Sequence, residues 1–319
     1  MLSKSLGLTS DNITYDLEDS VTPSAKPAAR TALREHLAGL SRQPPPPGVS
    51  ELAVRINAVS TPHALDDLTA LADTLPNLDA VVVPKVNSAS DLTFVSDVLQ
   101  HLAPERQQNS SSSSSNSNNN NSEDSSGSKP PIKLIALIES ARAVVDLQEI
   151  CGATPRLLSG LVFAAEDFAL DLSLTRTPSL AEFLYARSAI ATAARAWGLP
   201  SAIDLVCTAF RGAEGAARLE AECRGGKGLG FNGKQCIHPS QVEVVQRLFA
   251  PEEAEVQWAV RVVVADAKAA GVGRGAFTLD GSMIDAPVVG KARAVVEKAG
   301  RCGFDVDGLM QRWKDQEPE

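Results

Sequence analysis

The chain has 319 residues and a formal net charge of -9, with 39 acidic residues against 30 basic ones. This length allows one large α/β domain or a domain with an appendage. The acidic balance argues against nucleic acid as a partner, because such binding depends on neutralising phosphates. No apolar run reaches the roughly 18 residues that span a bilayer, and the first residues lack a secretory h-region. We therefore expect an intracellular protein with no membrane partner.

Seven short apolar runs alternate with helical patterns along the chain. The runs begin at Asn12, Glu51, Ala80, Lys133, Gly160, Ala202 and Gly233. Near-continuous apolar runs are typical of strands buried on both faces of a parallel sheet. The pattern predicts either an open doubly wound sheet or a (β/α)8 barrel, although seven strands are one short of a closed barrel.

A Ser/Asn-rich segment at about residues 105–130 interrupts this pattern. Its composition cannot bury enough apolar surface to offset the entropy of ordering, so we predict a disordered surface loop. Its many serines leave a phosphorylated regulatory tract as the alternative. The five cysteines include no C-x-x-C pair, which argues against a disulfide framework or a structural zinc site.

Charged residues follow most of the predicted strands at the point where each strand ends. They are Glu18, Asp19, Arg55, Lys85, Glu139, Glu166, Asp167 and Asp204. Any one of them alone is more simply explained as a helix cap or an ion pair. Glu139 and Asp167, however, follow successive strands, whose carboxyl ends meet at one edge of a parallel sheet. Two carboxylates with water form the oxygen site that Mg²⁺ prefers, so the sequence predicts a magnesium site there.

Arg55 ends the apolar run that contains Leu52, Ala53 and Val54. A partly buried arginine needs an anionic partner, and its planar guanidinium suits the carboxylate of a small acid substrate. A salt bridge to Glu18 or to the neighbouring Asp19 is the alternative, and the two roles are compatible.

Asp285 stands apart from these groups, in "GSMIDAP" after the glycine-rich "GVGRG". It suits the N-cap of the following helix, with Pro287 in the first turn. It also suits the acid/base that the strand-end carboxylates cannot supply, since metal ligands have their lone pairs committed to the cation.

Several motifs carry a resemblance to a known family. They are "YDLEDSVTPSAK", "VRINAVSTPHALDDL", "VVVPKVNSASD", "IALIESARAVV", "LVFAAEDFALDL", "AIDLVCTAFR", "GLGFNGKQCIHPSQ" and "GAFTLDGSMIDAP". In this order they resemble the citrate lyase beta-subunit family of the HpcH/HpaI aldolase group, in particular its mitochondrial citrate lyase beta-like branch. The resemblance implies a TIM barrel whose mouth holds Mg²⁺ on Glu139 and Asp167, with Arg55 binding the oxo acid.

The same resemblance implies that coenzyme A binds along the mouth, with contacts from Gln235 and Cys236 and from Lys4 near its phosphates. Asp285 is the implied catalytic acid/base, delivered from a neighbouring subunit of a homotrimer. The implied reaction makes or breaks a carbon–carbon bond between an acyl-CoA and a 2-oxo acid, as in citramalyl-CoA lyase and malate synthase-like reactions. A mitochondrial location follows from the resemblance alone.

Members of the family usually begin with a further strand ending in a "YVPG"-like turn, and this chain begins after it. We therefore expect a barrel domain over residues 1–270 that lacks its first strand. Residues 271–319 are expected to form a C-terminal helical extension that packs on a neighbouring subunit. The alternatives for function are a CoA-independent 2-oxo acid aldolase and an inactive CoA-binding homologue.

Overall fold

The computed structural model describes residues 2–5, 7–40, 49–107 and 129–319. It divides into two compact units, the first through Val245 and the second from Gln246 to Glu319. Most of the predicted Ser/Asn-rich loop, at residues 108–128, lies outside the described residues. The predicted boundary at residue 270 falls near the end of a long helix, whereas the structure divides the chain before this helix begins.

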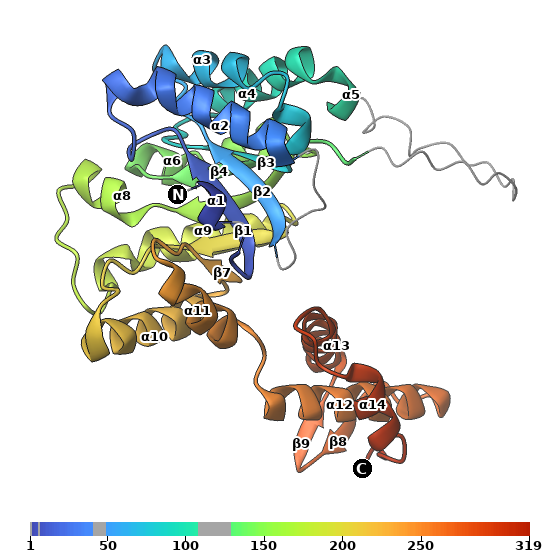
Figure 1. The fold of residues 1–319 in the computed structure, drawn as a ribbon. Helices are drawn as coiled ribbons and strands as arrows, with labels where there is room; N and C mark the ends of the chain where they lie inside the picture. Colours follow the sequence, from blue (N-terminus) through green and yellow to red (C-terminus); the bar gives the residue numbers. More distant parts are fainter. Residues whose placement is uncertain (1, 6, 41–48, 108–128) are drawn as a thin grey trace, which may run out of the picture. The chain divides into compact units, whose positions relative to one another are not determined.

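A parallel sheet of seven strands forms the centre of the first unit (Figure 1). The strands are β1 (Ser10–Asp16), β2 (Val49–Arg55), β3 (Ala80–Val83), β4 (Lys133–Ile138), β5 (Leu158–Phe163), β6 (Ser201–Asp204) and β7 (Gly233–Lys234). Each pairs with the next in chain order, so all seven predicted strands are confirmed. The sheet curls, but within the described residues no pairing joins β7 to β1. The structure therefore confirms a parallel α/β fold without confirming a full TIM barrel.

Both faces of the sheet are apolar, which explains the near-continuous apolar runs in the sequence. One face carries a cluster that includes Ala53, Val82, Ile135, Leu137 and Val162. Residues that alternate with these along the strands are also buried, because successive side chains point to opposite faces.

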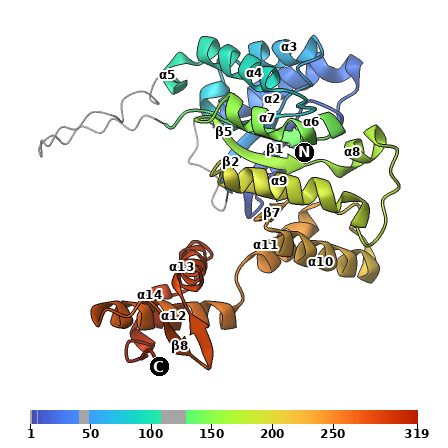
Figure 2. The same ribbon diagram turned by 180° about the vertical axis from the view of Figure 1, so that it is seen from behind.

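Helices follow the strands and cover the sheet (Figure 2). Their bounds are α1 (Leu2–Ser5), α2 (Lys26–Leu40), α3 (His63–Ala70), α4 (Ala89–Leu102), α5 (Pro104–Gln107), α6 (Ala141–Val145), α7 (Leu147–Ala153), α8 (Ala165–Asp171), α9 (Leu184–Ala196) and α10 (Gly212–Leu229). Short 3₁₀ turns lie at Pro23–Ala25, Leu75–Asn77, Ala181–Phe183 and Pro239–Gln241. The longer helices contact one another in the order α2, α3, α4, α7, α9 and α10, as expected when each covers its own strand pair.

The second unit is a small helical assembly built on one hairpin. The helix α11 (Val242–Phe249) spans the division, and α12 (Glu253–Gly271), α13 (Ala286–Arg301) and α14 (Val306–Arg312) follow, with the strands β8 (Phe277–Leu279) and β9 (Ser282–Ile284) between α12 and α13. Buried residues of α12 pack on the hairpin and on α13, which is why this helix belongs to the second unit. Asp280 and Gly281 both have positive φ values, as a tight two-residue hairpin turn requires.

Within the ranges that the structure describes, no helix combines the length and the apolarity needed to cross a bilayer.

Candidate active site at the carboxyl ends of the strands

The carboxyl edge of the sheet gathers five of the charged residues that the sequence analysis selected. Arg55 is the last residue of β2, Glu139 follows β4 directly, and Asp167 lies in the first turn of α8, just after β5. Glu18 and Lys85 join them from the segments after β1 and β3. Parallel strands bring these chain-distant residues to one edge, as predicted.

Arg55 is fixed by two acids. Its Nε and Nη2 donate to Asp16 Oδ1 and Oδ2 at 2.7 and 2.6 Å. Its Nη1 lies 3.0 Å from Glu18 Oε2. The salt bridge weighed as an alternative therefore exists, with Asp16 as an additional partner, and about a quarter of the Arg55 side chain (24%) remains exposed.

The acids beside Arg55 titrate differently. Burial disfavours the charged form of Asp16, but its hydrogen bonds from Arg55 and Ser20 outweigh burial and hold its pKa at about 2. Burial raises the pKa of Glu18 above its ordinary value, although Lys85 and Arg55 act in the opposite direction. The Lys26 ammonium positions Glu18 by donating to the carbonyl oxygens of Leu17 and Glu18, each at 3.0 Å.

Glu139 is buried, with only 4% of its surface exposed. Burial raises the pKa of its carboxyl to about 8; the backbone amide of Lys85 opposes this, and the charges of Asp167 and Glu18 add to it. Its Oε1 has no hydrogen-bond partner in the part of the chain that the structure describes. A buried, unpartnered carboxylate oxygen is costly for the fold unless something binds it.

Lys85 is a member of this site to which the sequence analysis assigned no role. Its Nζ donates to Glu18 Oε1 at 2.6 Å and lies 3.4 Å from Asp19 Oδ1 and 4.0 Å from Asp167 Oδ1. Its backbone has a φ of +50°, a conformation that few residues other than glycine adopt. Its position two residues after β3 was the one available signal, since a lysine gives no sequence indication of a positive φ.

An ionic network, largely buried except at Glu166, includes the sequence neighbour of Asp167. Arg176 pairs with Glu166, the neighbour of Asp167, and with Glu222 at 2.9 Å. Glu222 Oε2 lies in turn 3.0 Å from the fully buried Nζ of Lys234. These partners are far apart in the sequence, and the sequence analysis gave them no role.

The residues proposed from the resemblance for coenzyme A lie at the ends of β7 and in α1. Gln235 donates from Nε2 to the carbonyl oxygen of Phe163 at 3.3 Å, and its backbone amide donates to Asp204 O at 3.1 Å. Cys236 is exposed as a residue, yet desolvation of its thiol raises the pKa to about 11, so it is no thiolate nucleophile at neutral pH. Lys4 lies within α1, and its side chain is outside the described residues.

An aromatic stack next to Gln235 was missed from the sequence. The rings of Phe210 and His238 stack with centroids 5.0 Å apart and an interplanar angle of 17°. The Arg211 guanidinium lies 5.2 Å from the centroid of the Phe210 ring. Phe210 and His238 are both exposed, and His238 lies four residues after the end of β7.

Asp285 is the N-cap of α13, as the simpler interpretation of the sequence predicted. Its Oδ1 accepts a hydrogen bond from the Val288 amide at 3.2 Å, and the residue is half-buried. It belongs to the second unit, whereas the strand-end cluster belongs to the first.

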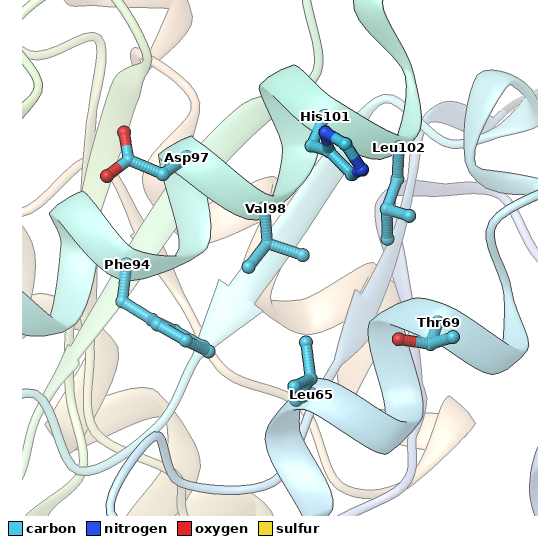
Figure 3. Close-up of a pocket in the computed structure, with 7 residues that line it drawn as sticks. All are labelled: Leu65, Thr69, Phe94, Asp97, Val98, His101 and Leu102. Atoms are coloured by element: carbon cyan, nitrogen blue, oxygen red, sulfur yellow. The ribbon is translucent and has the colours of Figure 1, made fainter.

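Away from the strand-end cluster, the described residues also form a hollow on the helical layer. The hollow, of about 360 Å³, lies between α3 and α4 and is lined by Leu65, Thr69, Phe94, Asp97, Val98, His101 and Leu102 (Figure 3). None of these residues belongs to the strand-end cluster. Across the described ranges, no group of three or more His, Cys, Asp and Glu side chains is arranged to hold a metal ion. A metal at the strand ends would therefore depend on two carboxylates and on oxygen ligands from water or substrate.

The chain is similar to known proteins over most of its length. The profile of the family described as HpcH/HpaI aldolase/citrate lyase matches residues 1–239. Citramalyl-CoA lyase from human mitochondria is 31% identical over 306 residues, covering 93% of this chain and 81% of that protein. A citrate lyase subunit beta-like protein of Deinococcus radiodurans is 35% identical over 288 residues, covering 90% of this chain and 88% of the other.

Among solved structures, the protein CitE of Mycobacterium tuberculosis, crystallised with magnesium, acetoacetate and coenzyme A, is similar in fold and sequence. The TM-score is 0.66 at 31% identity, and the match covers 92% of this chain and 91% of that one.

Proposed function

Because the chain belongs to the HpcH/HpaI aldolase/citrate lyase family, we propose that it is a Mg²⁺-dependent carbon–carbon lyase acting between an acyl-CoA and a 2-oxo acid. Citramalyl-CoA, which yields acetyl-CoA and pyruvate, and malyl-CoA are the proposed substrates. The observation that carries the proposal is the carboxylate pair of Glu139 and Asp167 at one sheet edge, with a buried, unpartnered oxygen on Glu139.

These two residues fit a magnesium ion. Mg²⁺ commonly takes one or two protein carboxylates and completes its shell with water or substrate oxygens. Glu139 supplies a desolvated oxygen, and the Asp167 side chain is about a third exposed (38%), which leaves room for further ligands. When bound, Mg²⁺ would polarise the carbonyl of the oxo acid.

Arg55 is the proposed binding residue for the carboxylate of the oxo acid. Asp16 and Glu18 hold its guanidinium in place, so little side-chain entropy is lost when a substrate binds. About a quarter of its side chain is exposed at the sheet edge that also carries Glu139 and Asp167, and charge-assisted contacts of arginine to carboxylates are strong.

Asp285 is the proposed catalytic acid/base for the acetyl carbon, supplied by a neighbouring subunit. Its Oδ1 caps α13, which fixes the side chain and leaves Oδ2 for proton transfer. A homo-oligomer, a trimer by the family resemblance, would complete each site in this way. A mitochondrial location is proposed from the human relative.

Coenzyme A is proposed to lie along the ends of β6 and β7, contacting Gln235 and Cys236, with Lys4 near its phosphates. The exposed ring of His238, three residues after Gln235, supports this placement, because its face away from Phe210 would stack with an adenine ring.

Product analysis tests the proposal. Purified protein is incubated with citramalyl-CoA or malyl-CoA in Mg²⁺ or in EDTA, and acetyl-CoA, free CoA and oxo acid are quantified. The account predicts acetyl-CoA and oxo acid in equal amounts, only with Mg²⁺, and loss of both with Glu139→Gln. Cleavage of a free hydroxy acid without CoA would support the aldolase alternative. Binding of acetyl-CoA without turnover would support the inactive CoA-binding homologue.

A further inference from the structure

Lys85 is held in an unusual conformation at the centre of the strand-end cluster. Its φ of +50° is strained for a residue with a side chain. The next loop secures it, because Asn87 Nδ2 donates to the Lys85 carbonyl at 3.2 Å and Asn87 Oδ1 accepts from Ser140 Oγ, one residue after Glu139. The fold therefore maintains a strained residue at the site, which is typical of a functional constraint.

The Lys85 ammonium is near four acids. Glu18 lies 2.6 Å away and Asp19 3.4 Å away. Asp167 Oδ1 is 4.0 Å away, and the charge of Glu139 also acts on the ammonium. Arg55 is paired with Asp16 and Glu18, and among the described basic side chains Lys85 is the one whose nitrogen lies within 4.0 Å of Asp167.

We propose that Lys85 is an internal counter-cation that makes Mg²⁺ and the anionic oxo acid bind interdependently, an inference that rests on the proposed function. A divalent ion on Glu139 and Asp167 would repel an ammonium 4.0 Å from one of those carboxylates. A substrate carboxylate bound by Arg55 and Lys85 together offsets the repulsion, so each ligand strengthens the other by the same factor. The Lys85 side chain is 37% exposed and flexible, so a ligand can reach it.

A purely structural role for Lys85 makes the opposite prediction. If its ion pairs only tie the loops after β1 and β3 together, removing the ammonium loosens the cluster and weakens metal binding. The sign of the change in Mg²⁺ affinity therefore separates the two roles.

The test is calorimetric titration of Mg²⁺ into the full chain, with and without pyruvate. Lys85→Gln removes the positive charge, and Lys85→Arg keeps it as the matched control. Lys85→Asn also removes the charge and serves if the glutamine variant folds poorly, because asparagine tolerates a positive φ. Without pyruvate we expect both neutral variants to bind Mg²⁺ about tenfold more tightly than the wild type, and the arginine variant to resemble it.

Pyruvate should tighten Mg²⁺ binding by the wild type. This effect should be severalfold smaller in the neutral variants, where only direct chelation of Mg²⁺ by pyruvate contributes to it. Unchanged or weaker Mg²⁺ binding by the neutral variants, or an undiminished pyruvate effect, would overturn the inference while leaving the metal site intact. A wild-type protein that binds no Mg²⁺ would overturn the proposed function as well.

Discussion

Replacing Gly226 by alanine should destabilise the first unit through one buried ion pair. A Cβ at Gly226 would lie 2.4 Å from Asp204 Oδ2 and 3.2 Å from its Cγ, well inside contact distance. Asp204 is fully buried and accepts from Arg187 Nε and Nη2 at 3.0 and 2.7 Å, so the carboxylate cannot move without giving up this pair.

The magnitude follows from two opposing effects. Disrupting a buried ion pair costs about 3–5 kcal/mol. Replacing glycine by alanine within a helix raises the free energy of unfolding by up to about 1 kcal/mol. We therefore expect Gly226→Ala to lower the free energy of unfolding by about 2–4 kcal/mol.

Gly228→Ala is the matched control, because Gly228 lies in the same helix, is exposed, and has nothing within 4 Å of a new Cβ. That variant should be neutral or more stable by up to about 1 kcal/mol. Urea denaturation followed by far-UV circular dichroism measures both. Equal stability of the two variants would refute the reasoning. Because the Asp204 carbonyl also accepts the Gln235 amide, Gly226→Ala should additionally weaken acyl-CoA binding.

Three further predictions concern the site. Burial raises the pKa of Glu139 to about 8, and a metal binds the ionised carboxylate. The apparent Mg²⁺ affinity should therefore rise by up to about tenfold per pH unit from pH 6 to 8 and then level off. A pH-independent affinity in calorimetry would contradict this prediction. A lysine at position 55 cannot reproduce the two hydrogen bonds to Asp16. For Arg55→Lys, kcat/KM for the CoA ester should therefore fall about 10–100-fold while Mg²⁺ affinity is retained. A kcat/KM within twofold of the wild type would count against Arg55 as the residue that binds the oxo acid. Asp285→Ala should abolish turnover but not Mg²⁺ binding. Mixed oligomers of Asp285→Ala and Glu139→Ala chains should regain activity. If verified mixed oligomers stay inactive, Asp285 does not act in the site of a neighbouring subunit.

The strand-end site was largely predictable because two simple rules combine. Apolar runs located all seven strands of the parallel sheet, although not the hairpin strands β8 and β9, and parallel pairing then brought Arg55, Glu139 and Asp167 to one edge. Composition and spacing carry this information, because burial on both sheet faces requires such runs.

The partners within the site were harder to predict. Asp16 pairs with Arg55 across 39 residues of chain and Arg176 with Glu222 across 46, and no local pattern specifies such pairs. The positive φ of Lys85 is imposed by Asn87 and the loop around it rather than by the preference of lysine. The boundary between the two units, before α12, likewise depends on tertiary packing. The small apolar side chains on the buried face of α12 could pack on either unit. In the structure they pack on the hairpin residues Phe277 and Leu279.

The most direct test of the metal site is anomalous diffraction from crystals soaked in Mn²⁺, which occupies the same kind of oxygen site as Mg²⁺. The account predicts a peak about 2.0–2.3 Å from carboxylate oxygens of both Glu139 and Asp167, and its loss in Glu139→Gln. A peak elsewhere in wild-type crystals, or none at this pair, would contradict the proposal that these two residues hold the metal.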